Sequence, residues 1–314
     1  MLTLTFLGTS AARPTVERSV SALAVHREGE MLLFDCGEGT QRQMMRYGVG
    51  FSLNDIFFTH FHGDHFLGVI GLVRTFALQG RTEPLVLSGP PGATRILGQA
   101  MDVGVERAPF PVEVRELKPG DRLPRDGYDL EVLPADHGGG AVGYALREHE
   151  RLGRFDPEKA RALGIPEGPL WGRLHRGEAV EWEERAGNDP SIRRSVDPSD
   201  LVGPPRPGRL IVLSGDTRPT QTLVEAATGA DVLVHEATFT HEERDRAVET
   251  RHSTALEAAQ VALAARARRL VLTHLSARFS AGWQDLLDEA RTVFPETEVA
   301  RDGMVVDVPY AAEE

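Results

Sequence analysis

The stretch Thr59-His60-Phe61-His62-Gly63-Asp64-His65 decides the fold of this chain and holds its densest group of metal-binding side chains. The apolar run 55–58 just before it has the length of a strand. From Phe66 to Leu78, apolar residues recur at helical spacing. We therefore expect the motif on a turn between a strand and a helix, where side chains are presented at the edge of a sheet.

The side chains of this motif suit zinc. In an extended stretch, His60 and His62 point the same way, because side chains repeat every second residue. The turn then directs Asp64 and His65 toward a second position nearby. Imidazole and carboxylate are common Zn²⁺ ligands, and two adjacent ligand sets indicate a two-metal site. A coincidental group of histidines on a polar loop is the alternative interpretation, and the tight spacing disfavours it.

The pattern H-x-H-x-D-H after an apolar strand resembles the signature of metallo-β-lactamase-fold hydrolases. This superfamily is broad, so the motif implies a fold and a metal without naming a substrate. Strand-like and helix-like segments interleave in both halves of the chain, and strands repeatedly end at a residue able to bind metal. We expect an α/β fold (an α+β sandwich) of the superfamily's αββα type, with two sheets packed face to face and helices outside.

Three further segments narrow the resemblance to ribonuclease Z, the tRNA 3′-processing endonuclease family of this superfamily. They are Phe6-Leu7-Gly8-Thr9, Arg18-Ser19-Val20-Ser21 and Phe34-Asp35-Cys36-Gly37-Glu38-Gly39-Thr40-Gln41. The run Gly68-Val69-Ile70-Gly71-Leu72 departs from the Gly-Leu-Pro-Gly-Leu-like run of many members. It keeps the apolar character, which indicates a variation in packing.

The resemblance implies a complete ligand set, residue by residue. A first zinc takes His60, His62 and His137, a second takes Asp64, His65 and His274, and Asp216 bridges the two. An aspartate suits the bridge because a carboxylate has two oxygens and neutralises part of the charge of the ions. Taken alone, each strand-end residue is equally consistent with an ordinary turn or sheet position. We expect two Zn²⁺ ions per chain, with Mn²⁺ as the alternative metal.

The same resemblance assigns two catalytic roles. Asp64 orients the attacking water and accepts its proton, and His252 is the general acid that protonates the leaving ribose 3′ oxygen. His235 or Glu236 orients His252 in this interpretation. The spacing equally allows both to be buried hydrogen-bonding groups that support the sheet.

The composition and the hydrophobic pattern of the sequence change between about Glu150 and Gly208. Hydrophobic periodicity weakens there, and proline, glycine and charged residues become frequent. Phe155-Asp156 and the stretch 164–174 resemble the flexible arm with which ribonuclease Z grips the body of tRNA. A disordered insertion is the alternative from composition alone.

We therefore expect a single metallo-β-lactamase domain over 1–314, with an inserted tRNA-binding arm over 150–208. Acidic residues balance the basic ones in the arm, so tRNA contact depends on particular residues. The expected contacts are Lys159, Arg173 and Arg176.

Composition and charge limit the partners. Apolar content of 41% and charged content of 26% are ordinary for a globular chain. The single cysteine, Cys36, excludes an intramolecular disulfide and a cysteine-based zinc ribbon. The net charge of −12 opposes a nucleic-acid partner, because phosphate binding needs a basic surface. Bound zinc and local arginine clusters have to override that charge if the substrate is tRNA.

The segment Met1–Phe6 has no basic region followed by a cleavage site, and the chain contains no long apolar span. We expect a cytoplasmic enzyme without a membrane partner, and the family resemblance implies a homodimer.

The family resemblance implies a zinc endonuclease that cuts precursor tRNA on the 3′ side of the acceptor stem. Its products are tRNA with a 3′-hydroxyl and a trailer with a 5′-phosphate. A general phosphodiesterase or a 3′ exoribonuclease on the same scaffold is one alternative, which the arm disfavours. A non-catalytic RNA-binding relative is another, which the complete ligand set disfavours.

Overall fold

The computed structural model describes residues 1–184, 192–280 and 282–311. It divides into two compact units. The first contains Met1–Arg147 and Arg209–Glu314, and the second is Glu148–Gly208. The segment predicted as an insertion therefore lies within the second unit, and its role in binding tRNA stays a prediction.

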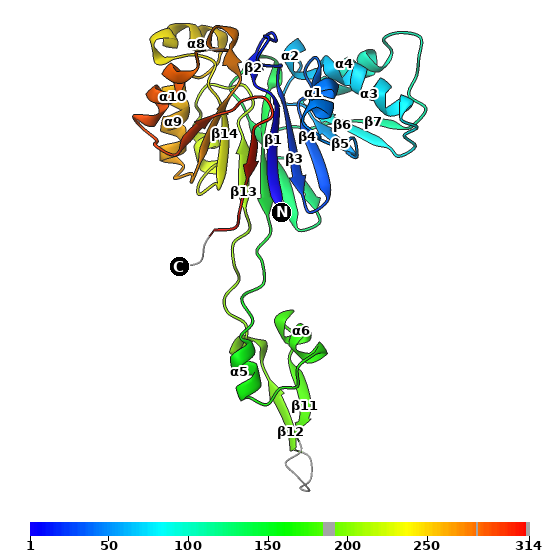
Figure 1. Cartoon of the computed structure of the whole chain (residues 1–314), viewed down its shortest axis with the longest axis vertical. Coiled ribbons are helices and arrows are strands. Elements are labelled where there is room, and N and C mark those ends of the chain that lie inside the picture. The colour runs from blue at the N-terminus through cyan, green and yellow to red at the C-terminus, as the bar shows by residue number, and fades with distance from the viewer. Residues whose placement is uncertain (185–191, 281, 312–314) are drawn as a thin grey trace. The chain divides into compact units, whose positions relative to one another are not determined.

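Two large mixed β-sheets form the centre of the first unit (Figure 1). The first sheet has the strand order β18 (Val305–Asp307), β1 (Leu2–Gly8), β3 (Ala22–Arg27), β4 (Glu30–Phe34), β5 (Asp55–Phe57), β6 (Leu85–Gly89) and β7 (Val112–Glu116). The second has the order β17 (Thr297–Val299), β15 (Leu270–Thr273), β14 (Val232–Glu236), β13 (Leu210–Leu213), β10 (Val142–Glu148), β9 (Tyr128–Pro134) and β8 (Arg122–Arg125). A short parallel pair joins β2 (Ser10–Ala11) to β16 (Leu275–Ser276).

Alternation along the strands builds a core on each face of each sheet. In β4, Leu32 and Phe34 lie in the core between the sheets, whereas Leu33 packs against the helices outside. In β13, Ile211 and Leu213 take the inner positions. Because successive side chains point to opposite faces, each strand contributes to two cores. Burial on both faces explains why these strands are near-continuous apolar runs in the sequence.

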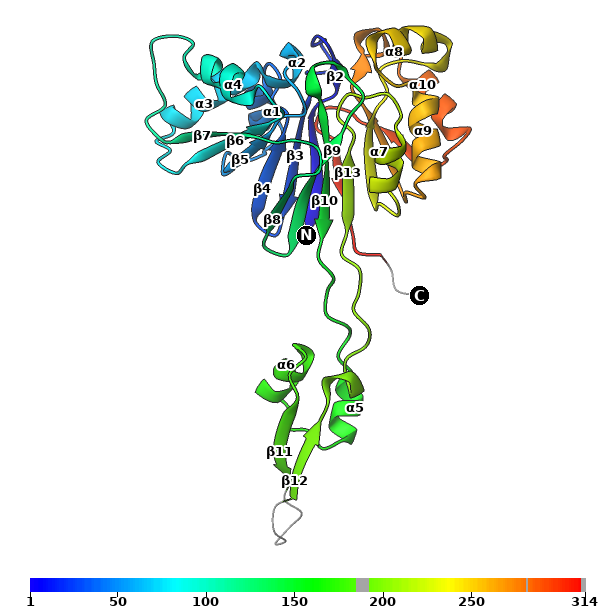
Figure 2. The ribbon, with the colours of Figure 1, turned by 180° about the vertical axis from the view of Figure 1, so that it is seen from behind.

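Helices cover the outer face of each sheet (Figures 1 and 2). The first sheet packs against α1 (Thr40–Arg46), α3 (Gly68–Leu78) and α4 (Ala93–Met101). The second packs against α7 (Gln221–Ala226), α9 (Ala255–Ala264) and α10 (Gln284–Arg291). The remaining helical segments of this unit are α2 (Gly63–Phe66), α8 (Arg244–Thr250) and the single 3₁₀ turns η1 (Gly138–Gly140), η3 (His241–Glu243) and η4 (Ala277–Phe279). These layers confirm the predicted αββα sandwich.

One predicted helix boundary differs from the structure. The helix expected over Phe66 to Leu78 is interrupted after α2, and α3 begins at Gly68. The backbone of Gly37 packs closely against Gly68, at the start of α3. A Cβ on Gly68 would lie only 1.9 Å from the Gly37 carbonyl oxygen. Helix α9 begins at Ala255, and Thr254 is its N-cap.

The second unit has regular structure and a core of its own, although the sequence predicts a flexible arm with weak periodicity. Its elements are α5 (Pro157–Ala162), α6 (Pro169–His175), the antiparallel hairpin of β11 (Val180–Glu184) and β12 (Ile192–Val196), and η2 (Pro198–Asp200). Its buried apolar residues are Ala160, Ile165, Leu174, Val180, Trp182, Val196 and Leu201. Each short element contributes only one or two of them, so no long hydrophobic period is visible in the sequence.

Candidate metal centre and active site

The histidine motif lies where β5 ends and α2 begins. His62 is extended, with φ −66° and ψ 148°, and it is the N-cap of α2, which carries Asp64 and His65 in its first turn. The turn after β4 holds this segment in place, since the Cys36 amide donates to the carbonyl oxygen of His65 at 2.7 Å. A Cβ on Gly37 would lie 2.3 Å from the Asp64 carbonyl oxygen, so this close approach requires glycine.

His60, His62 and His137 converge on one point. His62 Nδ1 lies 2.9 Å from His60 Nε2 and 3.2 Å from His137 Nε2. His137 comes from the end of β9, and its Nδ1–H donates to the carbonyl oxygen of Arg251 at 2.9 Å. That bond leaves the lone pair of His137 Nε2 facing the other two rings. In their unprotonated form, three imidazole nitrogens that converge in this way are a metal-binding arrangement.

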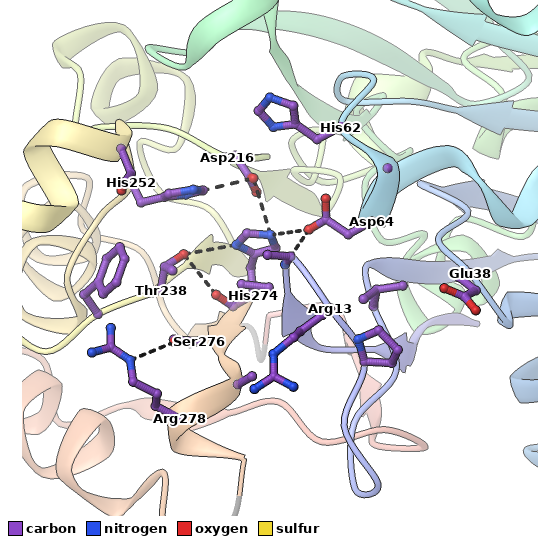
Figure 3. A pocket seen from close by; sticks show the side chains of 18 of the residues that line it. Arg13, Glu38, His62, Asp64, Asp216, Thr238, His252, His274, Ser276 and Arg278 are labelled. Atoms are coloured by element: carbon purple, nitrogen blue, oxygen red, sulfur yellow. Dashed lines mark hydrogen bonds and ion pairs between the residues drawn. The ribbon is translucent and has the colours of Figure 1, made fainter.

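A second group forms beside the first. His274 Nε2 lies 3.2 Å from His65 Nε2 and 3.3 Å from Asp64 Oδ2. Asp216 Oδ2 lies 3.4 Å from both His65 and His274 and 3.6 Å from His60 Nε2, so it faces both groups. Figure 3 shows Asp216 between His252, His274 and Asp64.

The spacing of these atoms fits zinc. Ligand atoms about 2.0–2.1 Å from a tetrahedral Zn²⁺ are roughly 3.3 Å apart, which matches the distances within both groups. The groups His60–His62–His137 and Asp64–His65–His274 are each compact enough to hold an ion, and Asp216 belongs to the neighbouring group with His60 and His65. The structure thus brings together all seven residues that the sequence predicts as ligands.

The ionisation of His60 and Asp216 suits a metal site. Burial lowers the pKa of His60 well below its ordinary value, and nearby His65 lowers it further, so the ring is neutral. Burial alone raises the pKa of Asp216, but His274 and His65 outweigh it and hold the carboxyl well below its usual range. Neutral imidazole and ionised carboxylate are the forms that bind metal. Burial lowers the pKa of His65, but Asp216 and Asp35 outweigh it and raise that pKa well above its ordinary value, so metal binding has to displace a proton from this ring.

Asp35 and Glu236 are two buried carboxylates that orient the histidine rings. Asp35 Oδ2 lies 2.7 Å from His65 Nδ1, and the Thr59 hydroxyl donates to Asp35 at 3.0 Å and contacts His60 Nδ1 at 3.1 Å. Each ring nitrogen that faces a carboxylate or hydroxyl leaves the opposite nitrogen for the cluster.

Glu236 makes the corresponding contacts on the other sheet. Its Oε2 accepts from the Thr238 hydroxyl at 2.7 Å, and Thr238 Oγ1 lies 3.0 Å from His274 Nδ1. Its Oε1 lies 2.8 Å from His252 Nδ1. Burial lowers the pKa of His252, but the charge of Glu236 outweighs it and raises the pKa to about 9.

The structure separates the two residues expected to orient His252. Glu236 contacts His252 directly, whereas His235 Nδ1–H donates to the carbonyl oxygen of Glu236 at 2.7 Å. His235 is fully buried, and its Nε2 has no hydrogen-bond partner within the described residues. His235 therefore suits the alternative role of a buried group in the sheet.

Sequence reasoning gave no individual role to Asp35 or Thr238. Asp35 follows β4 in the left-handed region with φ 57°, and His274 has φ 56°. Positive φ at a non-glycine residue is uncommon and clusters at functional sites. In the sequence, Asp35 stands at a strand end before a glycine-rich turn, within one of the segments that carry the family resemblance.

A cleft of about 680 Å³ opens over these side chains. Beyond the metal-binding and histidine cluster, its charged lining residues are Arg13, Arg246, Arg278 and Glu38. In Figure 3, Arg13 and Arg278 are drawn below His274, and Glu38 lies apart from them at the right. The guanidinium groups of Arg246 and Arg278 each lie 5.7 Å from the centre of the Phe239 ring.

The residues predicted to contact tRNA in the arm are on the second unit. Lys159 lies on α5 and Arg173 on α6, and Arg176 directly follows α6. Arg173 Nε and Arg176 Nε lie 2.9 and 3.3 Å from the carboxylate of Glu178. All of these side chains are at the surface, so the ion pairs are weak and open to exchange for phosphate.

Curated relatives match this chain over nearly its whole length. It is 56% identical over 310 residues to a protein named ribonuclease Z from Myxococcus xanthus, with 98% of each chain covered. It is 55% identical over 314 residues to a ribonuclease Z from Gemmatimonas aurantiaca, covering 99% of this chain and 98% of that one. This chain belongs to the ribonuclease Z family.

Solved structures agree with this assignment. The chain matches the crystal structure of the short form of human tRNase Z with 28% identity and a TM-score of 0.69, covering 98% of this chain and 99% of that one. The metallo-β-lactamase fold protein YhfI from Bacillus subtilis matches with 19% identity and a TM-score of 0.66, covering 97% and 98%, which supports the fold alone. A family model described as Anti-Pycsar protein Apyc1 matches residues 2–103, less than half of the chain.

The similarity to ribonuclease Z extends over the second unit as well. The match to the Myxococcus xanthus protein covers 98% of this chain, so the segment Glu148–Gly208 is part of the match. The family resemblance noted from short motifs is thus confirmed over the full length.

Proposed function

We propose that this chain is a metal-dependent endoribonuclease that removes the 3′ trailer from precursor tRNA. Its products are tRNA with a 3′-hydroxyl and a trailer with a 5′-phosphate. The observation that carries the proposal is the near full-length identity of up to 56% to ribonuclease Z. The convergence of all seven predicted ligands supports it and argues against a non-catalytic relative.

Two metal ions per chain are part of this proposal. His60, His62 and His137 hold the first, Asp64, His65 and His274 hold the second, and Asp216 is shared. We propose Zn²⁺, with Mn²⁺ as the alternative. When bound, the ions supply an activated water for attack at phosphorus and neutralise charge on the phosphoryl oxygens.

Asp64 accepts the proton of the attacking water in this proposal. Its Oδ2 accepts a hydrogen bond from the Ala12 amide at 2.7 Å, which aims the carboxylate at the cleft. Burial raises the pKa of Asp64, but hydrogen bonds from His274 and His65 outweigh it, so the carboxyl is ionised. The loop containing Ala12 thus contributes to the orientation of the base.

His252 is the proposed general acid. Its Nδ1 faces Glu236, so its Nε2 is the atom available to donate a proton to a bound substrate. His252 lines the cleft beside Asp216 (Figure 3). As the bond from phosphorus to the 3′ oxygen breaks, the proton passes from Nε2 to that oxygen.

Local charge at the cleft reconciles an acidic chain with an RNA substrate. The net charge is −12, yet three arginines and one glutamate are the charged residues that surround the cluster in the cleft. The Arg13 and Arg246 side chains are exposed. Arginine binds phosphate through paired N–H donors, so this rim favours the RNA backbone. Lys159, Arg173 and Arg176 are the proposed contacts of the second unit to the tRNA body.

The decisive experiment is to incubate metal-loaded protein with a precursor tRNA that carries a 3′ trailer and to map both new ends. We expect one cut at the acceptor stem and an intact trailer with a 5′-phosphate. Stepwise loss of single nucleotides from the 3′ end would instead indicate an exoribonuclease. An unstructured RNA of equal length is the control, and equal cleavage of that RNA would contradict recognition of tRNA.

Cellular location and oligomeric state do not follow from the proposed active site. Along the described parts of the chain, no helix combines the length and the apolar character needed to span a membrane. The cytoplasmic location and the homodimer expected from the sequence both stay predictions.

A further inference from the structure

Arg218 and Glu257 lie outside the metal-binding set, yet they hold the backbone that carries His252. The Arg218 guanidinium pairs with both carboxylate oxygens of Glu257, with Nη1 2.7 Å from Oε2. The same Nη1 donates to the carbonyl oxygen of His252 at 2.5 Å. The two side chains are 14% and 8% exposed, so little water competes with these contacts. Bidentate pairs of this kind impose geometry as well as attraction.

Glu257 also fixes the start of α9. Its Oε2 accepts from the Thr254 amide at 3.0 Å, and the Thr254 hydroxyl accepts from the Glu257 amide at 3.2 Å. This capping box satisfies amides that the helix itself leaves unpaired. Arg218 and the first turn of α9 therefore hold the segment 252–254 from both sides.

This segment serves both halves of the site. His252 presents its imidazole to Glu236, and the preceding carbonyl, that of Arg251, accepts from His137 Nδ1 at 2.9 Å. Arg251 has φ 57°, which turns the chain sharply at this point. Arg218 contacts the His252 carbonyl and not that of Arg251, so a shift at His252 would mainly displace the acid.

We propose that Arg218 and Glu257 are positioning residues for the proton transfer to the leaving oxygen. They hold the main chain of His252 so that Nε2 meets the 3′ oxygen of the substrate. The inference depends on the proposed function, because it requires His252 to be the acid. A buried ion pair that only stabilises the fold is the competing explanation, and it assigns no purpose to the bond with the His252 carbonyl.

The test compares two substrates in the Arg218→Gln variant. Precursor tRNA has a poor leaving group, whereas bis(p-nitrophenyl) phosphate has an activated one that needs little protonation. We expect kcat on precursor tRNA to fall by about 10- to 100-fold, as for other residues that orient a functional side chain. Turnover of the nitrophenyl diester, metal content and KM for tRNA should stay near the wild-type values.

Arg125→Gln is the matched control. Arg125 makes a bidentate pair with Asp55 at 2.9 and 3.1 Å, with side-chain exposures of 22% and 9%. Neither residue lines the cleft. The control loses a comparable ion pair and should process both substrates as the wild type does. Arg218→Lys keeps the positive charge but lacks the paired N–H donors of the guanidinium, so it should recover only part of the rate on tRNA.

Glu257→Gln provides an independent variant if Arg218→Gln fails to fold, and it should show the same selective loss. Equal losses on both substrates, or wild-type turnover of tRNA, in the folded variants would overturn the inference. His252→Ala is measured in parallel. If that variant shows no dependence on the leaving group, the acid role under the proposed function is wrong. If His252→Ala loses more activity on precursor tRNA than on the nitrophenyl diester, and the Arg218 and Glu257 variants show no such difference, only the positioning role is wrong.

Discussion

Asp35 Oδ2 lies 2.7 Å from Nδ1 of His65, and both side chains are buried. The carboxylate orients the ring so that Nε2 faces Asp64, Asp216 and His274. It also accepts from Thr59, which contacts His60. A single aspartate directly after β4 thus supports a ring in each proposed metal position.

The Asp35→Ala variant should bind metal about 10- to 100-fold more weakly, because it removes the partner that orients a ligand. The measurement is competition with a chelator of known affinity. Asp55→Asn, which removes a buried carboxylate remote from the cleft, is the control. Unchanged affinity in Asp35→Ala would contradict the role assigned to this residue.

The wild-type protein should contain close to two metal ions per chain, and Asp216→Ala should lose metal and activity together. Asp216 Oδ2 faces both ligand groups, so its loss removes an oxygen from each. Metal analysis after reconstitution with Zn²⁺ or Mn²⁺ gives the stoichiometry. A wild type that retains only a trace of either metal would disprove the two-metal proposal.

The His252→Ala variant should reduce turnover of precursor tRNA by about 10²- to 10⁴-fold, which is the usual contribution of a general acid. Metal content and tRNA affinity should change little, because His252 is outside the proposed ligand set. The nitrophenyl diester should be much less affected. His26→Ala on β3, remote from the cleft, controls for loss of a histidine as such.

Glu236→Gln should move the alkaline limb of the pH–rate profile to lower pH. The acid must be protonated, so activity falls as pH rises through the pKa of His252. Glu236 raises that pKa to about 9, and the neutral amide removes the favourable charge. The measurement is kcat/KM for precursor tRNA across pH in both proteins. An alkaline limb at the wild-type pH would show that Glu236 does not set this ionisation.

Replacing residues 152–206 by a short Gly/Ser linker should abolish efficient processing of precursor tRNA. Hydrolysis of a small phosphodiester should be largely unchanged, since all seven proposed ligands lie outside the second unit. Arg151 and Arg206 pair in a β-bridge, so the two ends are close enough for a short linker. Binding energy far from the scissile bond orients the substrate, and its loss lowers tRNA turnover and affinity together.

Measuring both precursor-tRNA processing and hydrolysis of the small phosphodiester distinguishes the possible roles of the deleted segment. Normal processing of precursor tRNA would disprove the arm assignment. Loss of both activities with two metals still bound would assign the segment to the active site.

The sequence by itself determined the ligand types and the layers of the fold. Apolar strands alternate with helical segments, and the motif His60 to His65 supplies four ligands from one turn, because these signals are local in the chain. His137, Asp216 and His274 came from the family resemblance, which applies position by position. The structure brings Asp216 and His274 together because β13, β14 and β15 are parallel and end at a common edge, and His137 joins them from the end of β9.

Only the tertiary structure decided which polar side chains support the site. Asp35 meets His65 from 30 residues away, and the Arg251 carbonyl meets His137 from 114 residues away. It also distinguished Glu236 from its neighbour His235, since adjacent residues on a strand point to opposite faces. The core of the second unit and the bond from Arg218 to His252 were equally invisible in the sequence. Such contacts depend on how sheets and loops pack, and no periodicity or spacing within a short stretch encodes them.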